Sequence, residues 1–377
     1  MRIAILGAGP AGLYLAYLIK RRQPDADIRV VEQNPRDATF GFGVVFSDRA
    51  LEFLRGDDPE TAAAISPHLQ TWQDITLDQG GERIAIDGVG FSAIGRLEFL
   101  LLLQERARSV GVAPVYGCAL TRLDELGEAD LVVGADGVNS MVRRSYAQAF
   151  GSTVGHFSNR FAWFGTTKSF ATLSQTFRAA HGHFNAHHYR YGAGMSTFIV
   201  EVDETTFLRE GFDSMPYAQA KAICERVFAD VLDGHTLVSN NSVWRQFSKV
   251  WNARWSHGRH VLIGDALHTA HFSIGSGTRL AMEDAIALDA ALARHPRDIG
   301  DALADYESAR RPVVEKLVAA ANASGDWYEK FADHMRLAPL DFAMSYLTRS
   351  GRIDRERLRR QSPSFVMRYE RERPTPA

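Results

Sequence analysis

Glycines and one acidic residue near the N-terminus have the types and spacing of a phosphate-binding turn. The run Gly7-Ala8-Gly9-Pro10-Ala11-Gly12 follows an apolar segment, and Glu32 comes about 20 residues after it. In such a turn the first glycine permits a tight bend, the second lets a pyrophosphate approach the backbone, and the third lets helix and strand pack closely. The acid can accept hydrogen bonds from a ribose. We therefore predict that Gly7, Gly9, Gly12 and Glu32 bind a dinucleotide.

Two later acidic residues also follow apolar segments. Asp136 ends one such segment, and Asp265 ends another, ahead of the glycine-rich stretch Gly275-Ser276-Gly277-Thr278. A glycine-rich stretch before a helix presents backbone N–H groups, which suits an anion or the polar edge of a ring. We predict that Asp265, Gly275, Gly277 and Thr278 belong to a binding site. From the residues alone, Asp136 is as consistent with a helix cap as with ligand binding.

A short run of histidines and tyrosines could move a proton. His187, His188, Tyr189 and Tyr191 alternate along an expected strand, so that one pair faces a pocket and the other faces away. Each of them can equally be an ordinary strand residue. His271 lies just before the glycine-rich stretch, where a role at the site and a role in loop packing are both open. No two histidines occur with an acid in the spacing of a metal site, so we predict no metal.

The segments that must position these residues alternate between strand and helix patterns. Residues 2–6, 10–22 and 28–32 predict a strand–helix–strand unit around the first glycine turn. Alternating apolar residues predict further strands at 71–77, 83–86, 160–167 and 195–202. Helical patterns occur at 97–109, 281–292, 299–323 and 327–335.

This order of elements predicts an α/β fold. We expect a Rossmann-like dinucleotide-binding domain with an inserted, mainly antiparallel β-sheet substrate domain and a helical C-terminal segment. The dinucleotide-binding domain is expected to be discontinuous. The predicted ranges are 1–70, 96–150 and 255–325 for that domain, 71–95 and 151–254 for the sheet, and 326–377 for the C-terminal segment.

Composition excludes several other classes of protein. The 377 residues contain 43 Lys and Arg against 45 Asp and Glu, a net charge of −2, so neither nucleic acid nor an anionic membrane is an expected partner. The two cysteines, Cys118 and Cys224, are too few for a disulfide framework and suit a reducing cytoplasm. No apolar run approaches the roughly 18 residues of a membrane-spanning helix, and we expect a soluble cytoplasmic protein. No feature predicts an oligomeric state.

Together the three ordered glycine-acid motifs resemble those of the single-component flavin-dependent aromatic hydroxylases, which have the para-hydroxybenzoate hydroxylase fold. The resemblance extends from Gly7 to about Asp284 and implies that the dinucleotide is FAD. It places the ADP part at the first glycine motif and Glu32, and the ribityl chain at Asp265. It also implies that Arg96 lies near the phosphate and ribityl parts and that Asp136 supports FAD and the nicotinamide donor. One departure is Ser273, where many members have proline.

A closer resemblance is to the aryl-CoA hydroxylases, which include salicyloyl-CoA 5-hydroxylase and the hydroxylase half of anthraniloyl-CoA monooxygenase. It rests on the stretches 41–47, 268–277, 283–286 and 347–353. It implies ring hydroxylation with NADH or NADPH and O2 through a C4a-hydroperoxyflavin, with salicyloyl-CoA converted to 5-hydroxysalicyloyl-CoA (gentisyl-CoA). Anthraniloyl-CoA, or an indole or tryptophan-derived intermediate as in violacein biosynthesis, stays open as the substrate. Because no reductase-like stretch follows, we expect hydroxylation without ring reduction.

Hydroxylation of a phenol is helped by a base that takes the phenolic proton. We expect His188, Tyr189 and His271 as catalytic residues and His187 and Tyr191 as substrate-binding residues. A CoA chain also needs cations for its phosphates, and guanidinium groups suit phosphates well. Arg359 and Arg360 lie in the dense basic stretch 352–360, and we expect them to bind those phosphates.

Overall fold

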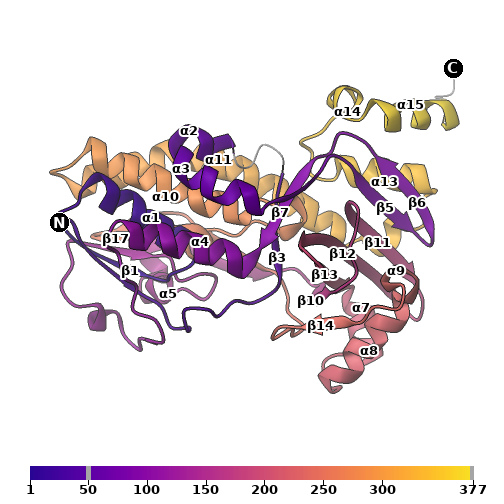
Figure 1. Ribbon diagram of the computed structural model, residues 1–377, viewed down its shortest axis with the longest axis horizontal. Coiled ribbons are helices and arrows are strands. Elements are labelled where there is room, and N and C mark those ends of the chain that lie inside the picture. Colours follow the sequence, from indigo (N-terminus) through magenta and orange to yellow (C-terminus); the bar gives the residue numbers. More distant parts are fainter. Residues whose placement is uncertain (48–51, 374–377) are drawn as a thin grey trace.

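The computed structural model describes residues 1–47 and 52–373. The predicted ranges 1–70 and 326–377 therefore each contain a few residues outside the described part of the chain. In Figure 1 the N-terminal strands and the long helices lie on the left, and a second, larger sheet lies on the right.

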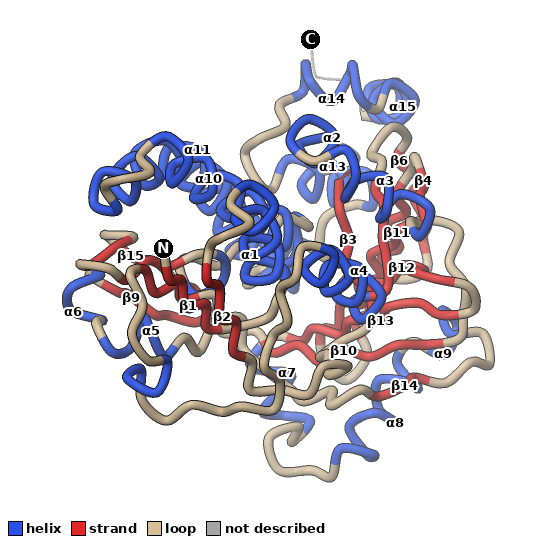
Figure 2. The backbone as a smooth tube through the Cα atoms, turned by 60° about the vertical axis from the view of Figure 1, so that its left-hand side comes forward, coloured by secondary structure: helices blue, strands red, loops and turns tan. Residues whose placement is uncertain are grey.

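A mostly parallel five-stranded sheet forms the first part of the fold (Figure 2). Its strands, in spatial order, are β16 (Ser256–His257), β17 (His260–Leu262), β8 (Leu131–Gly134), β1 (Arg2–Leu6) and β2 (Asp27–Val31). β1 pairs in parallel with β2 and β8, β8 pairs in parallel with β17, and β16 is antiparallel to β17. Because parallel strands end at one edge of a sheet, the turns after β1, β8 and β17 bring Gly7, Asp136 and Asp265 to the same edge.

A seven-stranded sheet forms the second part. Its strands, in spatial order, are β14 (Leu237–Ser239), β10 (Arg160–Thr166), β13 (Met195–Val202), β12 (His183–Gly192), β11 (Leu173–Ala179), β5 (Ile75–Gln79) and β6 (Glu82–Ile86). All neighbouring strands are antiparallel except β5 and β11. The register sets Gln175 opposite His187 and Asn185 opposite Glu201, so these four side chains share one face of the sheet.

Two small sheets join the larger ones. They consist of β3 (Gly43–Ser47), β7 (Phe91–Gly95) and β4 (Gln70–Trp72), and of β9 (Ser152–His156) and β15 (Ser248–Asn252). The single strand expected at 71–77 is therefore wrong in one respect. The chain leaves the small sheet after Trp72 and enters the large sheet at Ile75, since the two apolar stretches pack into different sheets.

Most of the helices cover the five-stranded sheet or close the C-terminal end. They are α1 (Pro10–Arg22), α2 (Glu52–Asp57), α3 (Pro59–Ile65), α4 (Arg96–Ser109), α5 (Met141–Ser145), α6 (Ala147–Phe150), α7 (Glu204–Glu210), α8 (Tyr217–Val227), α9 (Ala229–Leu232), α10 (Gly277–Arg294), α11 (Ile299–Tyr328), α12 (Phe331–His334), α13 (Pro339–Thr348), α14 (Arg355–Gln361) and α15 (Pro363–Glu372). α1 packs against α4 and α10, and α10 packs against α11.

The helix expected at 327–335 is not formed as a separate element. α11 continues to Tyr328, and only the short α12 follows. Trp327 and Tyr328 are buried in the apolar cluster that the seven-stranded sheet shares with the C-terminal helices, so packing extends α11 beyond its expected end. The proposed domain boundary at residue 325 thus falls inside a continuous helix.

The buried apolar side chains form three clusters. One lies around the five-stranded sheet with α1, α10 and α11, a second lies between β5, β6 and the C-terminal helices, and a third lies between the other face of the seven-stranded sheet and α7 to α9. The proposed division into a dinucleotide-binding domain, a sheet domain and a helical segment stays a prediction. The C-terminal segment shares its core with the sheet.

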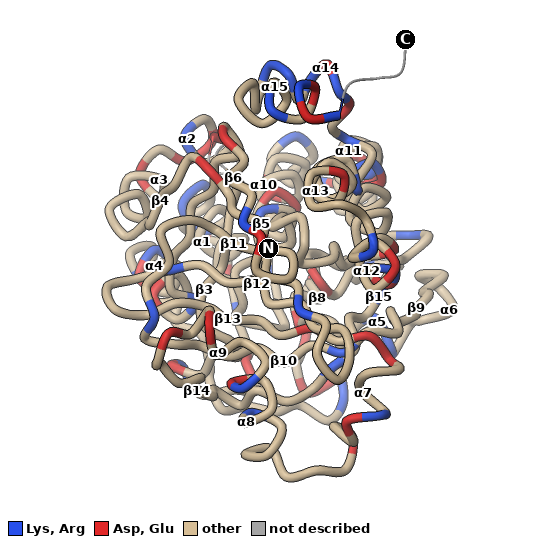
Figure 3. Tube along the Cα trace, turned by 90° about the vertical axis from the view of Figure 1, so that its right-hand side faces the viewer, with Lys and Arg blue, Asp and Glu red and all other residues tan. Residues whose placement is uncertain are grey.

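Charged residues of both signs are spread along the chain (Figure 3), and α14 and α15 carry a mixture of them. Within 1–47 and 52–373, no helix is long and apolar enough to cross a membrane. The same residues contain no group of three or more His, Cys, Asp or Glu that could hold a metal ion.

Candidate active site

The glycine turn after β1 has two positions where only glycine fits and one that is open. Gly7 has φ +106°, and a Cβ there would lie 2.3 Å from the Ala135 carbonyl oxygen. A Cβ at Gly12 would lie 2.0 Å from the Gly7 carbonyl oxygen. A Cβ at Gly9 would meet nothing within 4 Å. Gly7 and Gly12 are thus required by close backbone packing, whereas Gly9 leaves space at the N-terminus of α1 that a pyrophosphate can occupy.

The Glu32 carboxylate is fixed at the end of β2. Its Oε2 atom accepts a hydrogen bond from the backbone N–H of Ala8 at 2.9 Å, and its Oε1 atom accepts from Asn34 at 2.9 Å (backbone) and 2.7 Å (side chain). Glu32 therefore lies directly beside the glycine turn, where the remaining lone pairs of the carboxylate can accept from ribose hydroxyls.

A cavity of about 870 Å³ joins this turn to the seven-stranded sheet. The predicted cofactor residues that line it are Gly9, Glu32, Arg96, Asp265, Gly275, Gly277 and Thr278. Its far wall contains Phe161, Trp163, His187, Tyr189 and Ile199 from the sheet, with Phe247 and Phe272 from the loops. One cavity thus combines a phosphate-binding end with an aromatic end.

Arg96 and Asp265 both line this cavity and belong to residue types of opposite charge. Burial lowers the pKa of Arg96, and the carboxylate of Asp265 opposes that shift. Asp265 lines the cavity. Burial raises the pKa of its carboxyl group, and the charges of His268 and Arg96 oppose this shift. An arginine and a carboxylate without a direct bond to each other suit a ligand with both phosphates and hydroxyls, as a ribityl pyrophosphate has.

The loop before α10 leads to a helix start that no side chain caps. Gly275 has φ +59°, and Gly277 begins α10, whose first turn has no side-chain cap. Because Gly277 and Thr278 line the cavity, the N–H groups of this 18-residue helix start at the cavity wall. Its positive end suits the edge of a flavin ring on which reduction places negative charge.

Asp136 acts as a helix cap in the structure. Its Oδ2 atom accepts from the backbone N–H of Met141 at 2.6 Å, at the start of α5, and its Oδ1 atom is buried without a partner. Burial raises the pKa of Asp136. Ala135 and Gly137 line the cavity on either side of it. A direct contact between Asp136 and the cofactor stays a prediction.

The strand β12 separates the four predicted histidines and tyrosines. His187 and Tyr189 line the cavity. His188 lies on the opposite face, where its Nε2 atom is 2.9 Å from the Thr176 hydroxyl and its ring packs 4.1 Å from the ring of Phe170. This corrects the expectation that His188 is catalytic, because successive side chains of a strand point to opposite faces.

Tyr189 and Tyr191 support the segment around Gly43. The Tyr189 hydroxyl donates to the Gly43 carbonyl oxygen at 2.9 Å, and burial raises its pKa. A Cβ at Gly43 would lie 2.6 Å from Cβ of Tyr191. Tyr189 therefore has its proton engaged by the backbone and is poorly suited to act as a base. A substrate contact of Tyr191 stays a prediction.

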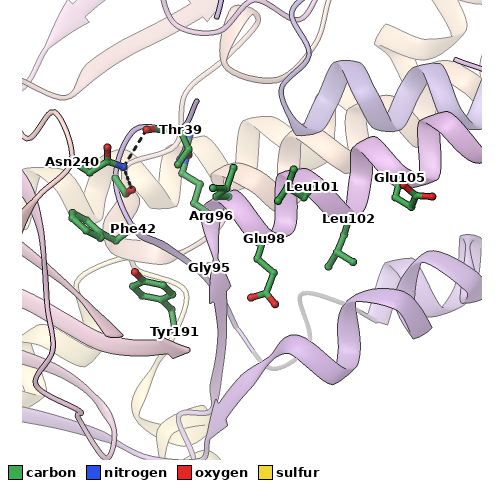
Figure 4. A pocket seen from close by; sticks show the side chains of 12 residues that line it. Thr39, Phe42, Gly95, Arg96, Glu98, Leu101, Leu102, Glu105, Tyr191 and Asn240 are labelled. Carbon is green, nitrogen blue, oxygen red and sulfur yellow. Dashed lines mark hydrogen bonds between the residues drawn. The ribbon is translucent and has the colours of Figure 1, made fainter. Parts of the chain in front are cut away.

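Tyr191 lines a second, neighbouring pocket of about 610 Å³ (Figure 4). This pocket lies along α4 and is also lined by Phe42, Leu101 and Leu102. Figure 4 shows the Asn240 amide turned toward Thr39, and it donates to the carbonyl oxygens of Thr39 at 3.2 Å and Gly41 at 3.0 Å. Residues of the segment before β3 line both pockets.

Arg359 and Arg360 lie on α14 and line neither pocket. Arg359 is paired with Glu370 at 2.5 Å, and Arg360 lies 3.8 Å from Glu356. Both side chains are exposed. Their role in binding CoA phosphates stays a prediction, and it requires the CoA chain to reach α14.

Sequence reasoning missed a group of buried polar residues on the cavity side of the seven-stranded sheet. Gln175, Asn185 and Glu201 share the face of His187, and each has a side-chain atom without a partner. The alternation along β11, β12 and β13 could have indicated this group. It places polar residues on a sheet face where a sheet that packs on an apolar core has apolar residues.

The comparisons with known proteins agree with this site. Residues 106–321 match the FAD binding domain family. The chain is 42% identical to salicyloyl-CoA 5-hydroxylase of a Streptomyces species, over 98% of this chain and 73% of that protein. It is 34% identical to protodeoxyviolaceinate monooxygenase of Chromobacterium violaceum, over 92% of this chain and 94% of that protein.

Solved structures share the fold. The crystal structure of PqsL, a probable FAD-dependent monooxygenase from Pseudomonas aeruginosa, matches with a TM-score of 0.70 at 20% identity, over 92% of this chain and 100% of that chain. A mutant of 2-methyl-3-hydroxypyridine-5-carboxylic acid oxygenase matches with a TM-score of 0.73 at 18% identity, over 96% of this chain and 98% of that chain.

The family match and the relatives show that the chain is an α/β flavoprotein monooxygenase. The chain belongs to the FAD binding domain family and is an FAD-dependent aromatic hydroxylase similar to salicyloyl-CoA 5-hydroxylase. The predicted fold class and FAD as the cofactor are confirmed. The open position at Gly9, the fixed Glu32 and the Arg96–Asp265 pair fit this cofactor.

Proposed function

We propose that this enzyme hydroxylates an aromatic ring carried as a CoA thioester, with salicyloyl-CoA converted to 5-hydroxysalicyloyl-CoA. The observation that carries the proposal is the 42% identity to salicyloyl-CoA 5-hydroxylase, which extends over 98% of this chain. The reaction consumes the aromatic substrate, O2, NAD(P)H and a proton, and yields the hydroxylated ring, water and NAD(P)+. One oxygen atom enters the ring, and the other leaves as water.

The chain's own residues bind, orient and exclude water. Gly9, Glu32, Arg96 and Asp265 would hold FAD, which supplies the electron transfer and the activation of O2 when bound. The aromatic end of the cavity would hold the ring. The apolar wall of this end, which includes Phe161, Trp163 and Phe247, excludes water. A dry site prevents loss of the activated oxygen to water before it reaches the ring.

The regiochemistry follows from the substrate. In salicyloyl-CoA the 5-carbon is para to the 2-hydroxyl, so electron donation from the phenol oxygen favours attack at that carbon. A residue that accepts a hydrogen bond from the hydroxyl leaves more electron density on this oxygen and so favours the step. We assign this role to His187, which lines the cavity and whose two ring nitrogens have no partner among the described residues.

A second candidate is an aryl group bound to a carrier protein. The chain is 36% identical to 3-hydroxy-4-methyl-anthranilyl-(aryl-carrier protein) 5-monooxygenase of Streptosporangium sibiricum, over 94% of this chain and 95% of that protein. Anthraniloyl-CoA and an indole or tryptophan-derived acid are the remaining alternatives. We place the enzyme in the cytoplasm, where NAD(P)H and acyl-CoA are available.

The test is substrate-stimulated oxidation of NADH and NADPH by the purified yellow holoenzyme, with identification of the product. Salicyloyl-CoA, anthraniloyl-CoA, free salicylate and tryptophan are offered separately. We expect stimulation by salicyloyl-CoA and a thioester with one added oxygen at carbon 5. Stimulation by a free acid or an indole alone contradicts the thioester proposal and leaves the FAD-dependent hydroxylase class unchanged.

A further inference from the structure

A chain of four buried or half-buried side chains connects the C-terminal segment to His271. Arg349, directly after α13, donates through Nε to the Ser324 hydroxyl at 2.9 Å. The Ser324 and Ser273 hydroxyl oxygens are 2.7 Å apart, and the Ser273 hydroxyl is 2.7 Å from Nδ1 of His271. Arg349 also donates through Nη2 to the Ser273 carbonyl oxygen at 2.8 Å.

The donors at its two ends, the Arg349 guanidinium and the Ser273 backbone N–H, set the direction of the hydrogen bonds in this chain. A guanidinium has donors only, so the Ser324 oxygen must accept from it. Ser324 can then give its own proton to Ser273, and Ser273 gives its proton to Nδ1 of His271. The backbone N–H of Ser273 points to the same Nδ1 atom at 3.4 Å, which also requires an acceptor there. His271 is therefore the neutral tautomer with its proton on Nε2.

The surroundings of His271 keep it neutral. Its side chain is buried, and its ring packs against the rings of Phe247, Phe272 and Phe157 at 4.4 to 5.1 Å. Burial lowers the pKa of His271 to about 3, and the charges of Arg349 and His187 act in the same direction. A histidine that is neutral and protonated on Nε2 is a hydrogen-bond donor at every working pH. It is not the base that the sequence suggested.

His187 is the complementary side chain. It lines the cavity, and neither of its ring nitrogens has a partner within residues 1–47 and 52–373. Burial lowers its pKa to about 3, with a contribution from the charge of Arg349. A neutral imidazole without internal partners can accept a hydrogen bond from a ligand, and leaving both nitrogens unpaired in the bound state would be costly.

Arg349 itself has no salt bridge with a described carboxylate; its ring contacts are Tyr346 at 3.8 Å and Tyr328 at 5.9 Å. Its guanidinium donates to the Ser273 carbonyl oxygen at 2.8 Å, and its positive charge helps to lower the pKa of both His271 and His187.

We propose that Arg349 is a positioning residue for hydroxylation: through Ser324 and Ser273 it holds His271 as an Nε2–H donor. His271 lies between Ala270 and Phe272, which line the cavity, and pairs with His187 as acceptor to bind an aroyl group that carries a hydroxyl next to its carbonyl. The donor meets the carbonyl oxygen and the acceptor meets the hydroxyl. This inference rests on the proposed function, because an ortho-hydroxyaroyl thioester has these two groups on adjacent atoms.

The first test measures the tautomer and does not depend on turnover. Holoenzyme labelled with ¹⁵N in histidine is examined by two-bond ¹H–¹⁵N correlation spectra, and the His271 signals are assigned by their loss in His271→Gln. We expect an unprotonated Nδ1 and a protonated Nε2 in the parent enzyme. In Ser273→Ala and Ser324→Ala we expect a mixture of tautomers. Nδ1–H or a charged ring in the parent enzyme overturns the proposal.

The second test measures coupling of NAD(P)H oxidation to product. We expect Ser324→Ala to lower kcat for salicyloyl-CoA about tenfold and to raise uncoupled oxidation. The matched control is Ser308→Ala on the same helix, whose exposed hydroxyl donates only to the Asp305 carbonyl oxygen at 3.2 Å and which we expect to be unchanged. Arg349→Lys keeps a donor and should retain more coupling than Arg349→Ala. Equal coupling in Ser324→Ala and Ser308→Ala overturns the proposal.

The third test compares ligands. His187→Leu should weaken binding of salicyloyl-CoA about tenfold or more, measured by the change in flavin absorbance, and should change binding of benzoyl-CoA, which lacks the hydroxyl, by much less. Equal losses for both ligands contradict the acceptor role of His187. If the parent enzyme binds no aroyl-CoA, the proposed function fails, whereas the tautomer measurement still decides the part played by Arg349.

Discussion

The Nε2 atom of His268 lies 2.8 Å from the Oδ2 atom of Asp284, and both side chains are buried. The same Oδ2 atom accepts from the backbone N–H of Gly264 at 3.0 Å, and Oδ1 accepts from Nε of Arg310 at 2.9 Å. One carboxylate on α10 therefore connects α11 with the turn that carries Asp265. The position of Asp265 in the cavity depends on a residue that does not line the cavity itself.

Asp284→Asn should destabilise the protein by about 3 kcal/mol, because it leaves buried Arg310 with one carboxylate fewer. Burial alone would raise the pKa of Asp284, but His268 and Arg310 lower it below its ordinary value. Its contribution to stability is thus present above the unfolded-state pKa of about 4 and is lost as the pH falls through the lower folded-state value. Thermal unfolding between pH 3 and 7 measures both effects.

The control for this variant is Asp289→Asn on the same helix. Asp289 pairs with Arg22 at 2.5 Å, but both side chains are partly exposed, and we expect a loss of at most about 1 kcal/mol. Similar losses in the two variants would mean that the buried His268–Asp284–Arg310 group contributes no more stability than a partly exposed ion pair. FAD content should fall in Asp284→Asn and stay unchanged in Asp289→Asn.

Gly9→Ala and Gly12→Ala separate a cofactor contact from a packing requirement. A Cβ at Gly9 has free space in the protein, and its φ of −75° suits alanine, so the apoprotein should unfold at the parent temperature. FAD should bind at least about tenfold more weakly, since the methyl group enters the cavity.

Gly12→Ala places its Cβ 2.0 Å from the Gly7 carbonyl oxygen and should destabilise the apoprotein itself. Calorimetry of apoprotein and fluorescence titration with FAD distinguish the two results, and unchanged FAD affinity in Gly9→Ala would remove Gly9 from the site.

The FAD part of the fold could be predicted because its signals are local. The turn at Gly7, the helix from Pro10 and the acid Glu32 lie within one strand–helix–strand unit, where spacing along the chain fixes spacing in space. Asp265 was also predictable, since it follows a buried strand and precedes a glycine-rich turn.

The substrate end could not be predicted in the same way, because it is built from long-range pairing. Alternation along β12 shows that His187 and His188 face opposite sides, but not which side meets the cavity. The cavity itself is lined by residues from Ala8 to Ala281, which are far apart in the sequence. The contact of Arg349 with Ser273 joins residues 76 positions apart, and no pattern near either residue indicates it.

Tyr189→Phe should reveal a structural role for this hydroxyl. Its proton is donated to the Gly43 carbonyl oxygen, and Thr197 holds the Gly43 N–H at 2.9 Å, so the sheet fixes the segment that lines the cavity. We expect a loss of about 1 kcal/mol in stability, with coupled hydroxylation retained and its pH profile unchanged. Tyr191→Phe serves as the control, because no hydrogen bond from its hydroxyl is recorded among the described residues. Loss of turnover in Tyr189→Phe with unchanged stability would restore the catalytic role expected from the sequence.

Glu201→Gln should stabilise the enzyme at neutral and alkaline pH. Burial raises the pKa of the Glu201 carboxyl to about 8, with a smaller contribution from the charge of Glu329, while the hydrogen bond from Asn159 opposes the shift. Because the folded protein keeps a proton that the unfolded chain loses near pH 4.5, stability falls as the pH rises from about 4.5 to 8.

A glutamine has no proton to lose. Its amide can also donate to Asn185, which lies opposite on the neighbouring strand and whose Oδ1 atom is buried without a partner. We expect the variant to be more stable than the parent by on the order of 3 kcal/mol at pH 8 and about equal at pH 4.5. Denaturant unfolding at both pH values measures the difference, and Glu204→Gln, an exposed carboxylate at the start of α7, should show none. The opposite result is a parent enzyme that loses no stability relative to Glu201→Gln between pH 4.5 and pH 8. It would mean that Glu201 is ionised in the folded state and that its Oε2 atom, which has no partner in this structure, has one in solution.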